Sequence, residues 1–287
     1  MRKIKILILG SSGSLGSQLV KDLKNNYQLI KISRKNHFFD ENFNQLKKLI
    51  IKIKPCFIIN CIAILGLKFC ENNLKETLKF NYKLPKKVSD FSSKNNIKFI
   101  HFSSEAVFIG NKKRKIYRED DKGNPTTCYG ISKFKADRYL IKKKNTLVVR
   151  LPLLYGPTNK NQIVSKLVSA VKNNKKIHVS TDIYSTPVYT PFVSSFIKNF
   201  VLVNSSFFFK KKIIHISTNK LISIYCFIKK IVKIIKKETY VFPVKDSFFN
   251  KENENVIKPK YLGLKTKFAQ CIDKTVINKK LISGLIK

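Results

Sequence analysis

Acidic side chains are scarce in this 287-residue chain. It contains 17 Asp and Glu against 58 Lys and Arg, which gives a formal net charge of +41. Such an excess is typical of proteins that bind nucleic acid or an anionic membrane surface. The lysines, however, are spread through every segment and form no local basic stripe. We therefore expect no nucleic-acid partner, and only a positive field that attracts anionic ligands.

Cysteine pairs of the CxxC type are missing as well. The six cysteines are scattered, and several lie in apolar runs, where a thiol behaves as a small hydrophobic side chain. The four histidines show no metal-ligand spacing, so no metal site is expected. This cysteine usage indicates a reducing compartment.

Apolar runs of membrane-spanning length are also absent from the sequence. The longest candidates, Cys56–Leu67 and Val193–Phe209, are too short or are interrupted by polar residues. Residues Met1–Lys5 lead directly into a strand-like run and a glycine loop, which leaves no room for a signal peptide. We therefore predict a cytoplasmic protein without membrane association.

Short apolar runs alternate with helical patterns in the first half of the chain. This alternation is typical of a parallel sheet covered by helices on both faces, which is the doubly wound, Rossmann-type α/β fold. The expected strands are Ile4–Leu9, Gln28–Ile32, Cys56–Asn60, Lys98–Ser103 and Thr146–Arg150, and the expected helical stretches are Ser14–Asn25, Asn42–Lys54, Glu71–Asn95 and Cys128–Lys143.

The pattern loosens beyond Pro152 and indicates a smaller lobe. We predict that residues 1–155 form the Rossmann domain, and that residues 156–287 form a C-terminal substrate-binding lobe with some chain crossing back to the sheet. In this part we expect helices near 162–173, 191–203 and 221–237 and short strands near Ile177 and Ile213. The apolar run Phe207–Phe209 is interpreted as a buried strand.

Three glycines follow the first expected strand. Gly10, Gly13 and Gly16 form GxxGxxG at the point where a helix begins. Such a turn needs unusual backbone angles, and a side chain there would keep a pyrophosphate away from the amides at the helix N-terminus. The loop therefore predicts a dinucleotide site.

The residues after the second expected strand bear on the choice of dinucleotide. Ser33, Arg34 and Lys35 stand where an NAD-specific protein would carry a carboxylate for the ribose hydroxyl. A hydroxyl and two cations suit the 2′-phosphate of NADP, although a surface Arg-Lys pair is ordinary in so basic a chain. Asp40 is a candidate for the adenine amino group, with a solvated loop carboxylate as the alternative.

Tyr129 and Lys133 form YxxxK on an expected helix, where a spacing of four places both on one face. Reduction of a carbonyl needs a proton on oxygen as hydride reaches carbon, and a nearby ammonium eases ionisation of a phenol. Lys133 would also hold the nicotinamide ribose. Ser104, at the end of the preceding strand, can hydrogen-bond the same carbonyl oxygen. These three residues are the predicted catalytic group.

Several longer segments accompany these motifs. They are GSSGSLG at Gly10–Gly16, INCIA at Ile59–Ala63, CE at Cys70–Glu71, Asn81 with Pro85, HFSSEAVFIG at His101–Gly110, YREDD at Tyr117–Asp121, PTTCYGISK at Pro125–Lys133, VVRLPLLYGP at Val148–Pro157 and KPKYLGL at Lys258–Leu264. On these segments the chain, from Lys3 to about Leu264, resembles the extended short-chain dehydrogenases/reductases, and within them the dTDP-4-dehydrorhamnose reductase group.

The resemblance implies roles for individual residues. The proton donor would be Tyr129, with Lys133 as its partner, and both would also contact the cofactor. Ser104 and Glu105 would face the substrate. The residues implied to bind the cofactor diphosphate and adenosine are Gly10, Gly13, Ser14, Leu15, Gly16, Cys61, Ile62 and Ala63.

Two departures from the reductase pattern concern the sugar. The group usually carries polar residues where this chain has Ile64 and Leu65, and Asp-Tyr where it has Glu105 and Ala106. In the family these positions face the sugar, so apolar replacements would remove hydrogen bonds that select the substrate.

We expect an NADPH-dependent reductase of a nucleotide-linked 4-keto sugar, acting in the synthesis of surface polysaccharide sugars; NADH and a homodimer are left open. The first alternative is an epimerase or dehydratase of nucleotide sugars that retains NAD. A non-catalytic regulatory subunit of the same fold is the second, because a relative of these reductases is the regulatory subunit of methionine adenosyltransferase. Nucleic-acid binding through the positive charge ranks below both.

Overall fold

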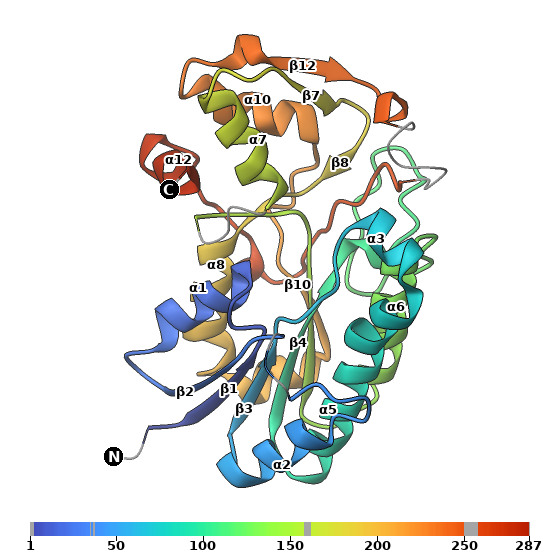
Figure 1. The fold of residues 1–287 in the computed structure, drawn as a ribbon, viewed down its shortest axis with the longest axis vertical. Coiled ribbons are helices and arrows are strands. Elements are labelled where there is room, and N and C mark those ends of the chain that lie inside the picture. Colours follow the sequence, from blue (N-terminus) through green and yellow to red (C-terminus); the bar gives the residue numbers. More distant parts are fainter. Residues whose placement is uncertain (1–2, 35, 37, 158–161, 250–257, 287) are drawn as a thin grey trace.

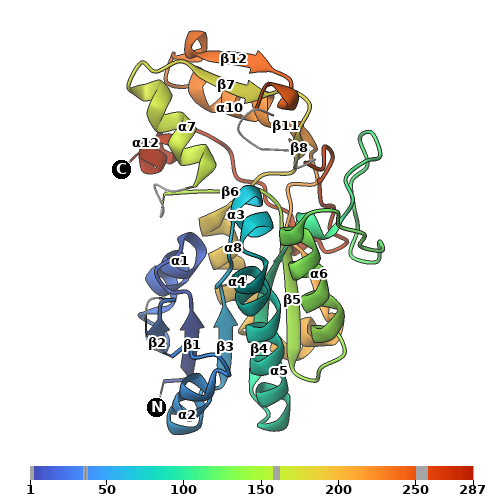
Figure 2. The same ribbon diagram turned by 45° about the vertical axis from the view of Figure 1, so that its right-hand side comes forward.

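The computed structural model describes residues 3–34, 36, 38–157, 162–249 and 258–286. At its centre lies a six-stranded sheet in the order β10-β5-β4-β3-β1-β2, and all neighbouring strands are parallel (Figures 1 and 2). The predicted doubly wound parallel sheet is confirmed. The strands are β1 (Lys5–Leu9), β2 (Gln28–Ile32), β3 (Phe57–Asn60), β4 (Lys98–Ser104), β5 (Thr146–Leu151) and β10 (Ile213–His215).

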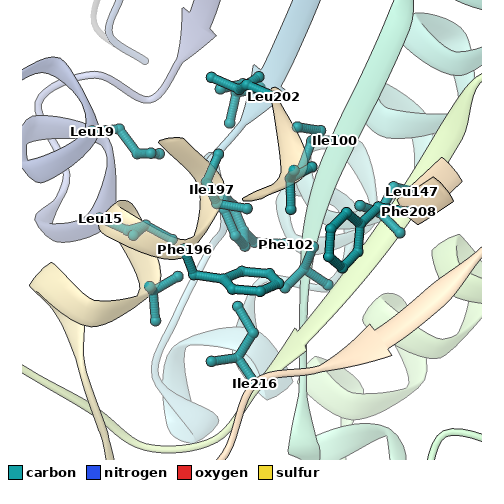
Figure 3. Close-up of a cluster of buried hydrophobic side chains, with 14 of the residues drawn as sticks. Leu15, Leu19, Ile100, Phe102, Leu147, Phe196, Ile197, Leu202, Phe208 and Ile216 are labelled. Atoms are coloured by element: carbon teal, nitrogen blue, oxygen red, sulfur yellow. The ribbon is translucent and has the colours of Figure 1, made fainter. Parts of the chain in front are cut away.

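Helices α1 (Ser14–Leu23), α8 (Thr190–Phe196) and α9 (Ser205–Lys211) cover one face of this sheet. Figure 3 shows how they interlock: Leu15 and Leu19 of α1 and Phe196 of α8 meet Ile100 and Phe102 of β4 in one apolar cluster. Burial of such side chains contributes roughly 1.5–3 kcal/mol each. This layer fixes the start of α1, and with it the glycine loop.

Helices α2 (Asn44–Ile53), α5 (Leu84–Lys94) and α6 (Cys128–Leu140) cover the opposite face. The helical stretch expected over 71–95 is divided into α3 (Leu67–Asn72), α4 (Leu74–Leu78), a π-helical turn η1 (Lys79–Lys83) and α5. Within η1 the buried Asn81 side chain hydrogen-bonds the backbone N–H and C=O of Ile64. The π turn therefore ties this helical stretch to the segment after β3.

The remaining elements form a lobe beyond the carboxyl ends of the strands (Figure 2). The lobe has its own apolar cluster, built from α7, α10, α12 and the parallel pair β7–β12. Its elements are β6 (Leu154–Tyr155), α7 (Ile163–Lys172), β7 (Ile177–Ser180), β8 (Tyr184–Ser185), β9 (Val188–Tyr189), β11 (Ile222–Ser223), α10 (Ile224–Lys233), β12 (Val241–Val244) and α12 (Lys279–Ile286).

Three elements that follow residue 156 in the chain pack with the sheet. Helices α8 and α9 lie on its face, and β10 pairs with β5. The chain thus passes from the sheet to the lobe, back to the sheet and out again. The boundary between residues 155 and 156 remains a prediction of the sequence.

The sequence interpretation of Phe207–Phe209 as a strand is wrong, because these residues lie in helix α9. Phe208 and Phe209 are buried on the sheet and Phe207 is 47% exposed, an arrangement that a helix produces from three consecutive apolar residues. Among the described helices, none is by itself long and apolar enough to cross a bilayer. Thr190–Val201 and Ser205–Lys211 meet that length and composition only as a pair bent by 112°.

Candidate active site

A cavity of about 660 Å³ opens where the sheet meets the C-terminal lobe. Its sheet side consists of loops at the carboxyl ends of parallel strands, the usual ligand position in doubly wound folds. Its described lining residues are Gly13, Ser14, Leu15, Cys61, Ile62, Ala63, Leu65, Gly66, Phe102, Ser103, Ser104, Glu105, Tyr129, Lys133, Leu151, Pro152, Leu153, Leu154, Gln162 and Ile163.

The three loop glycines differ in what they accommodate. Gly10 has φ = +81°, and a Cβ there would lie 2.9 Å from the Ile62 nitrogen. A Cβ on Gly16 would collide with the Gly10 carbonyl. A Cβ on Gly13 would meet only the Gly10 oxygen, at an ordinary 3.4 Å, yet Gly13 borders the cavity. Packing of the protein thus requires Gly10 and Gly16, whereas packing alone does not require a glycine at position 13, on the cavity wall.

Helix α1 begins immediately after Gly13. The first-turn amides of Leu15 and Gly16 lack intrahelical acceptors, and the positive end of the helix dipole lies at the same place. The Gln162 side chain, at the start of α7, donates a hydrogen bond to the Ser14 hydroxyl. The loop therefore offers an anion site of the kind that binds a diphosphate, with a residue of the lobe closing over it.

Tyr129 and Lys133 project from the first turns of α6. Thr127 caps this helix by accepting a hydrogen bond from the Gly130 amide at 3.1 Å. A Cβ on Gly130 would collide with the Ala106 carbonyl, so this glycine lets α6 pack closely on the turn after β4. Ser104, at the end of β4, lines the cavity together with Tyr129 and Lys133. The structure thus brings the three predicted catalytic residues together at the floor of the cavity.

Burial shifts the two titrating groups of the triad in opposite directions. Loss of hydration raises the pKa of Tyr129 to about 12, and the nearby Ser104 hydroxyl opposes the shift. It lowers the pKa of Lys133 to about 8, against the attraction of Asp137 and Cys61. Tyr129 therefore keeps its proton at neutral pH, as a proton donor must.

Lys133 is 1% exposed, and its side chain contacts residues of strand β4. Its Nζ donates to the Phe102 carbonyl at 2.6 Å and lies 3.2 Å from Nε2 of His101. The Nδ1 atom of His101 lies 3.0 Å from Nδ2 of Asn60 on β3. His101 is fully buried in the core, and no sequence pattern pointed to its contact with Lys133.

Glu105, predicted to face the substrate, borders the cavity with a carboxyl group that the lobe engages. The Ser185 hydroxyl of β8 reaches both Glu105 oxygens at 2.9 Å and accepts the Leu153 amide at 3.3 Å. Burial raises the pKa of Glu105 well above its usual range. This cluster joins the end of β4 to the lobe.

Of the apolar departures, Leu65 alone lines the cavity among the described residues, where it is 66% exposed. Ile64 is buried in the core under α5 and α6, and its backbone is bonded to Asn81. Ala106 is also buried. The expectation that Ile64 and Ala106 face a sugar is therefore wrong, because both side chains are buried and neither lines the cavity in the described part of the chain.

Ser33, Arg34 and Asp40 do not line the cavity in the described part of the chain. The Ser33 amide and hydroxyl both bond the Asn36 side chain, and Arg34 lies 3.8 Å from Glu76. The Asp40 carboxylate accepts the amides of residues 44 and 45 at the start of α2. Lys35 lies outside the described residues. Their proposed roles at the adenosine end of a dinucleotide remain predictions.

The lobe contributes lining residues that sequence reasoning missed. Gln162 and Ile163, from the start of α7, carry no recognisable motif, and Gln162 meets Ser14 across 148 positions of the chain. Leu153 and Leu154 also line the cavity; they lie within the VVRLPLLYGP segment at Val148–Pro157, but the sequence predicted no role for them.

Comparison with known proteins agrees with this geometry. Residues 4–278 match the family model described as RmlD substrate binding domain. The spore coat polysaccharide biosynthesis protein SpsK of Bacillus subtilis is 25% identical over 84% of this chain and 82% of its own length. A dTDP-4-dehydrorhamnose reductase of Aggregatibacter actinomycetemcomitans is 26% identical, and the match covers 67% of this chain and 65% of that reductase.

A solved structure shows the same fold. The dTDP-4-dehydrorhamnose reductase of Bacillus anthracis, crystallised in complex with NADP, aligns with a TM-score of 0.84 and 23% identity, covering 99% of this chain and 98% of that one. The family resemblance noted in the sequence is confirmed. Because the family model spans nearly the whole sequence, the chain belongs to the RmlD substrate binding domain family.

Proposed function

We propose that this protein is an oxidoreductase that uses NADPH to reduce a nucleotide-linked 4-keto sugar, in the manner of a dTDP-4-dehydrorhamnose reductase. The observation that carries the proposal is the floor of the cavity. There Ser104, Tyr129 and the buried Lys133 line one cavity, and the glycine loop opens into the same cavity.

Bound NADPH supplies the hydride that adds to the carbonyl carbon. Ser104 and Tyr129 bind the carbonyl oxygen, and Tyr129 transfers its phenolic proton to that oxygen to complete the alcohol. The charge left on the phenolate is stabilised by the Lys133 ammonium one helical turn away. The high pKa of Tyr129 in the free protein suits this direction of reaction, because the donor starts fully protonated.

The glycine loop and the segment after β3 form the proposed cofactor surface. The amides at the start of α1 would bind the diphosphate, and Cys61, Ile62 and Ala63 would line the adenosine side. Ser33 and Arg34 would take the 2′-phosphate once Arg34 leaves Glu76, an exposed ion pair that stabilises the fold by at most about 1 kcal/mol. The NADP complex of the Bacillus anthracis reductase supports this choice.

The substrate would enter between the sheet and the lobe. Leu65 and Ile163 line that part of the cavity and are 66% and 53% exposed. Apolar contacts there suit a deoxygenated or methyl-bearing sugar better than one with many hydroxyl groups. The name of the SpsK relative supports a role in surface polysaccharide synthesis, and the cytosol is the proposed compartment.

A substrate panel with NADPH tests the proposal. Purified protein is incubated with 4-keto sugars linked to different nucleotides, while NADPH absorbance and sugar products are followed together. Consumption of one NADPH for each sugar reduced supports the reductase. Sugar conversion without net NADPH loss would identify an epimerase or dehydratase instead. Absence of turnover, combined with an unchanged cellular phenotype for Tyr129→Phe, would indicate a regulatory subunit.

A further inference from the structure

A chain of three buried polar side chains runs beneath the cavity floor. It begins at Asn60 on β3, continues through His101 on β4 and ends at Lys133 on α6. Asn60 and His101 are fully buried, and Lys133 is 1% exposed. In such surroundings each donor must face an acceptor, so the hydrogen atoms can be assigned.

The assignment starts at Asn60. Its Oδ1 accepts the Ile62 amide at 3.0 Å, which fixes the orientation of the side-chain amide. Its Nδ2 therefore faces His101 and donates to Nδ1 at 3.0 Å. A ring nitrogen that accepts carries no proton, so neutral His101 bears its proton on Nε2. Burial lowers the pKa of His101 well below its usual range, in agreement with a neutral ring.

The Nε2–H of His101 then points at Lys133 Nζ, 3.2 Å away. An ammonium group has three donors and no acceptor, so an N–H of the Lys133 ammonium would face the Nε2–H of His101. A neutral amine has a lone pair that accepts from Nε2–H, while one of its own N–H groups donates to the Phe102 carbonyl at 2.6 Å. The geometry favours the neutral amine.

We propose that His101 is a positioning residue for Lys133: held by Asn60 in the Nε2–H form, it favours the neutral amine until an anionic cofactor enters the cavity and Lys133 takes up a proton. The inference relies on the proposed function only for NADPH as that anion. Above about pH 8, where the free protein carries the neutral amine, Lys133 would thus gain its charge on loading.

Other titratable groups around Lys133 do not reverse the preference for the neutral amine over the ammonium. Asp137, one turn along α6, favours the ammonium, but its Oδ2 is committed to Arg150 on β5 at 2.8 Å. Cys61, next to β3, is kept as a neutral thiol because burial raises its pKa. Tyr129 is likewise neutral, and burial lowers the pKa of Lys133 to about 8.

The first test reads the cofactor-free protein by NMR, so its outcome does not depend on the proposed function. In ¹⁵N-histidine-labelled protein we expect His101 to show a protonated Nε2 and an unprotonated Nδ1. In protein labelled with ¹³C at lysine Cε, the signal lost in Lys133→Met should titrate near pH 8. A proton on Nδ1, or a Lys133 midpoint above pH 10, would overturn the proposal.

Asn60→Asp reverses the arrangement with almost no change in shape. One carboxylate oxygen still accepts a hydrogen bond from the Ile62 amide. The other oxygen can only accept, so His101 must carry its proton on Nδ1. The Nε2 atom of His101 is then unprotonated and accepts a hydrogen bond from a Lys133 ammonium. We expect the His101 tautomer to switch and the Lys133 midpoint to rise by about one pH unit or more. Asn81→Asp is the matched control, since it buries the same carboxylate on η1 against Ile64 and Ser132, and should leave the tautomer unchanged. A tautomer unchanged in Asn60→Asp would contradict the proposal.

His101→Gln gives an independent variant if Asn60→Asp does not fold, because the Gln carbonyl can accept from Lys133 and should raise the same midpoint. Calorimetry of NADPH binding at pH 8.5, in two buffers of different ionisation enthalpy, should detect uptake of a fraction of a proton by the wild type and less by His101→Gln. Equal uptake, or none in the wild type despite tight binding, would overturn the role of His101.

Discussion

The floor of the cavity, formed by Ser104, Tyr129 and Lys133, and the outer edge of the sheet beyond β2 differ in how their side chains are held. On the floor, Lys133 is 1% exposed and donates a hydrogen bond to the Phe102 carbonyl of the sheet, and Ser104 and Tyr129 line the same cavity. At the β2 edge, Arg34 is about half exposed and lies 3.8 Å from Glu76. The proposed chemistry thus depends on groups fixed by burial, whereas the proposed cofactor selectivity depends on surface side chains whose present ion pairs are weak.

This difference has consequences for substitutions. A change on the floor removes a group that neighbouring residues cannot replace, because the packing leaves no freedom to move. A change at the edge removes an exposed group whose interactions compete with water and salt. We therefore expect large effects on rate from the floor, and small effects on selectivity from the edge.

Substitution of Tyr129 by Phe should have the largest effect. It removes the proton donor but keeps the ring, so kcat for NADPH-dependent sugar reduction should fall about 10²–10⁴-fold. Steady-state kinetics measure the loss. NADPH affinity, followed by fluorescence titration, should stay within about twofold and serves as the control. Retention of most of the activity would show that Tyr129 is not the donor.

Two glycines offer a matched pair of alanine substitutions. Gly13→Ala should lower NADPH affinity about tenfold or more while leaving the melting temperature near that of the wild type, because its Cβ meets only the Gly10 oxygen at 3.4 Å. Gly16→Ala should instead lower the melting temperature, because its Cβ collides with the Gly10 carbonyl. Equal affinity for NADPH in Gly13→Ala and the wild type would argue against a diphosphate at the loop.

Lys133 should impose a basic limb on the pH profile. Its lowered pKa of about 8 means that the free enzyme carries the ammonium below that pH and loses it above. The value of kcat/KM for NADPH should therefore fall up to tenfold per pH unit above about pH 8. Tyr129, with a pKa of about 12, does not titrate in this range. A profile flat to pH 10 would be inconsistent with this assignment.

Arg34→Gln should have the smallest effect of the four. Loss of one exposed cation at the 2′-phosphate should lower the preference for NADPH over NADH about fivefold, on the scale of about 1 kcal/mol for an exposed charge pair. Arg138→Gln, which removes an exposed cation from α6, controls for the change in net charge. If both variants keep the wild-type preference, selectivity does not depend on Arg34.

Local structure with clear sequence patterns was predicted well from the sequence. The loop glycines and the Tyr129–Lys133 spacing define a turn and one helix face, and both motifs occur where the sheet was expected to end. Phe207–Phe209 misled because three apolar residues fit a helix as well as a strand. Contacts such as Glu105 with Ser185 join positions 80 apart, and no local pattern encodes such a pairing.

Transfer of a labelled hydride tests the central claim most directly. The enzyme is supplied with NADPH deuterated at the transferable C4 position and a nucleotide-linked 4-keto sugar, and the product is analysed by mass spectrometry and NMR. The account predicts one deuterium on the former carbonyl carbon and an equal amount of NADP⁺. Product without deuterium, or with NADPH undiminished, would contradict it.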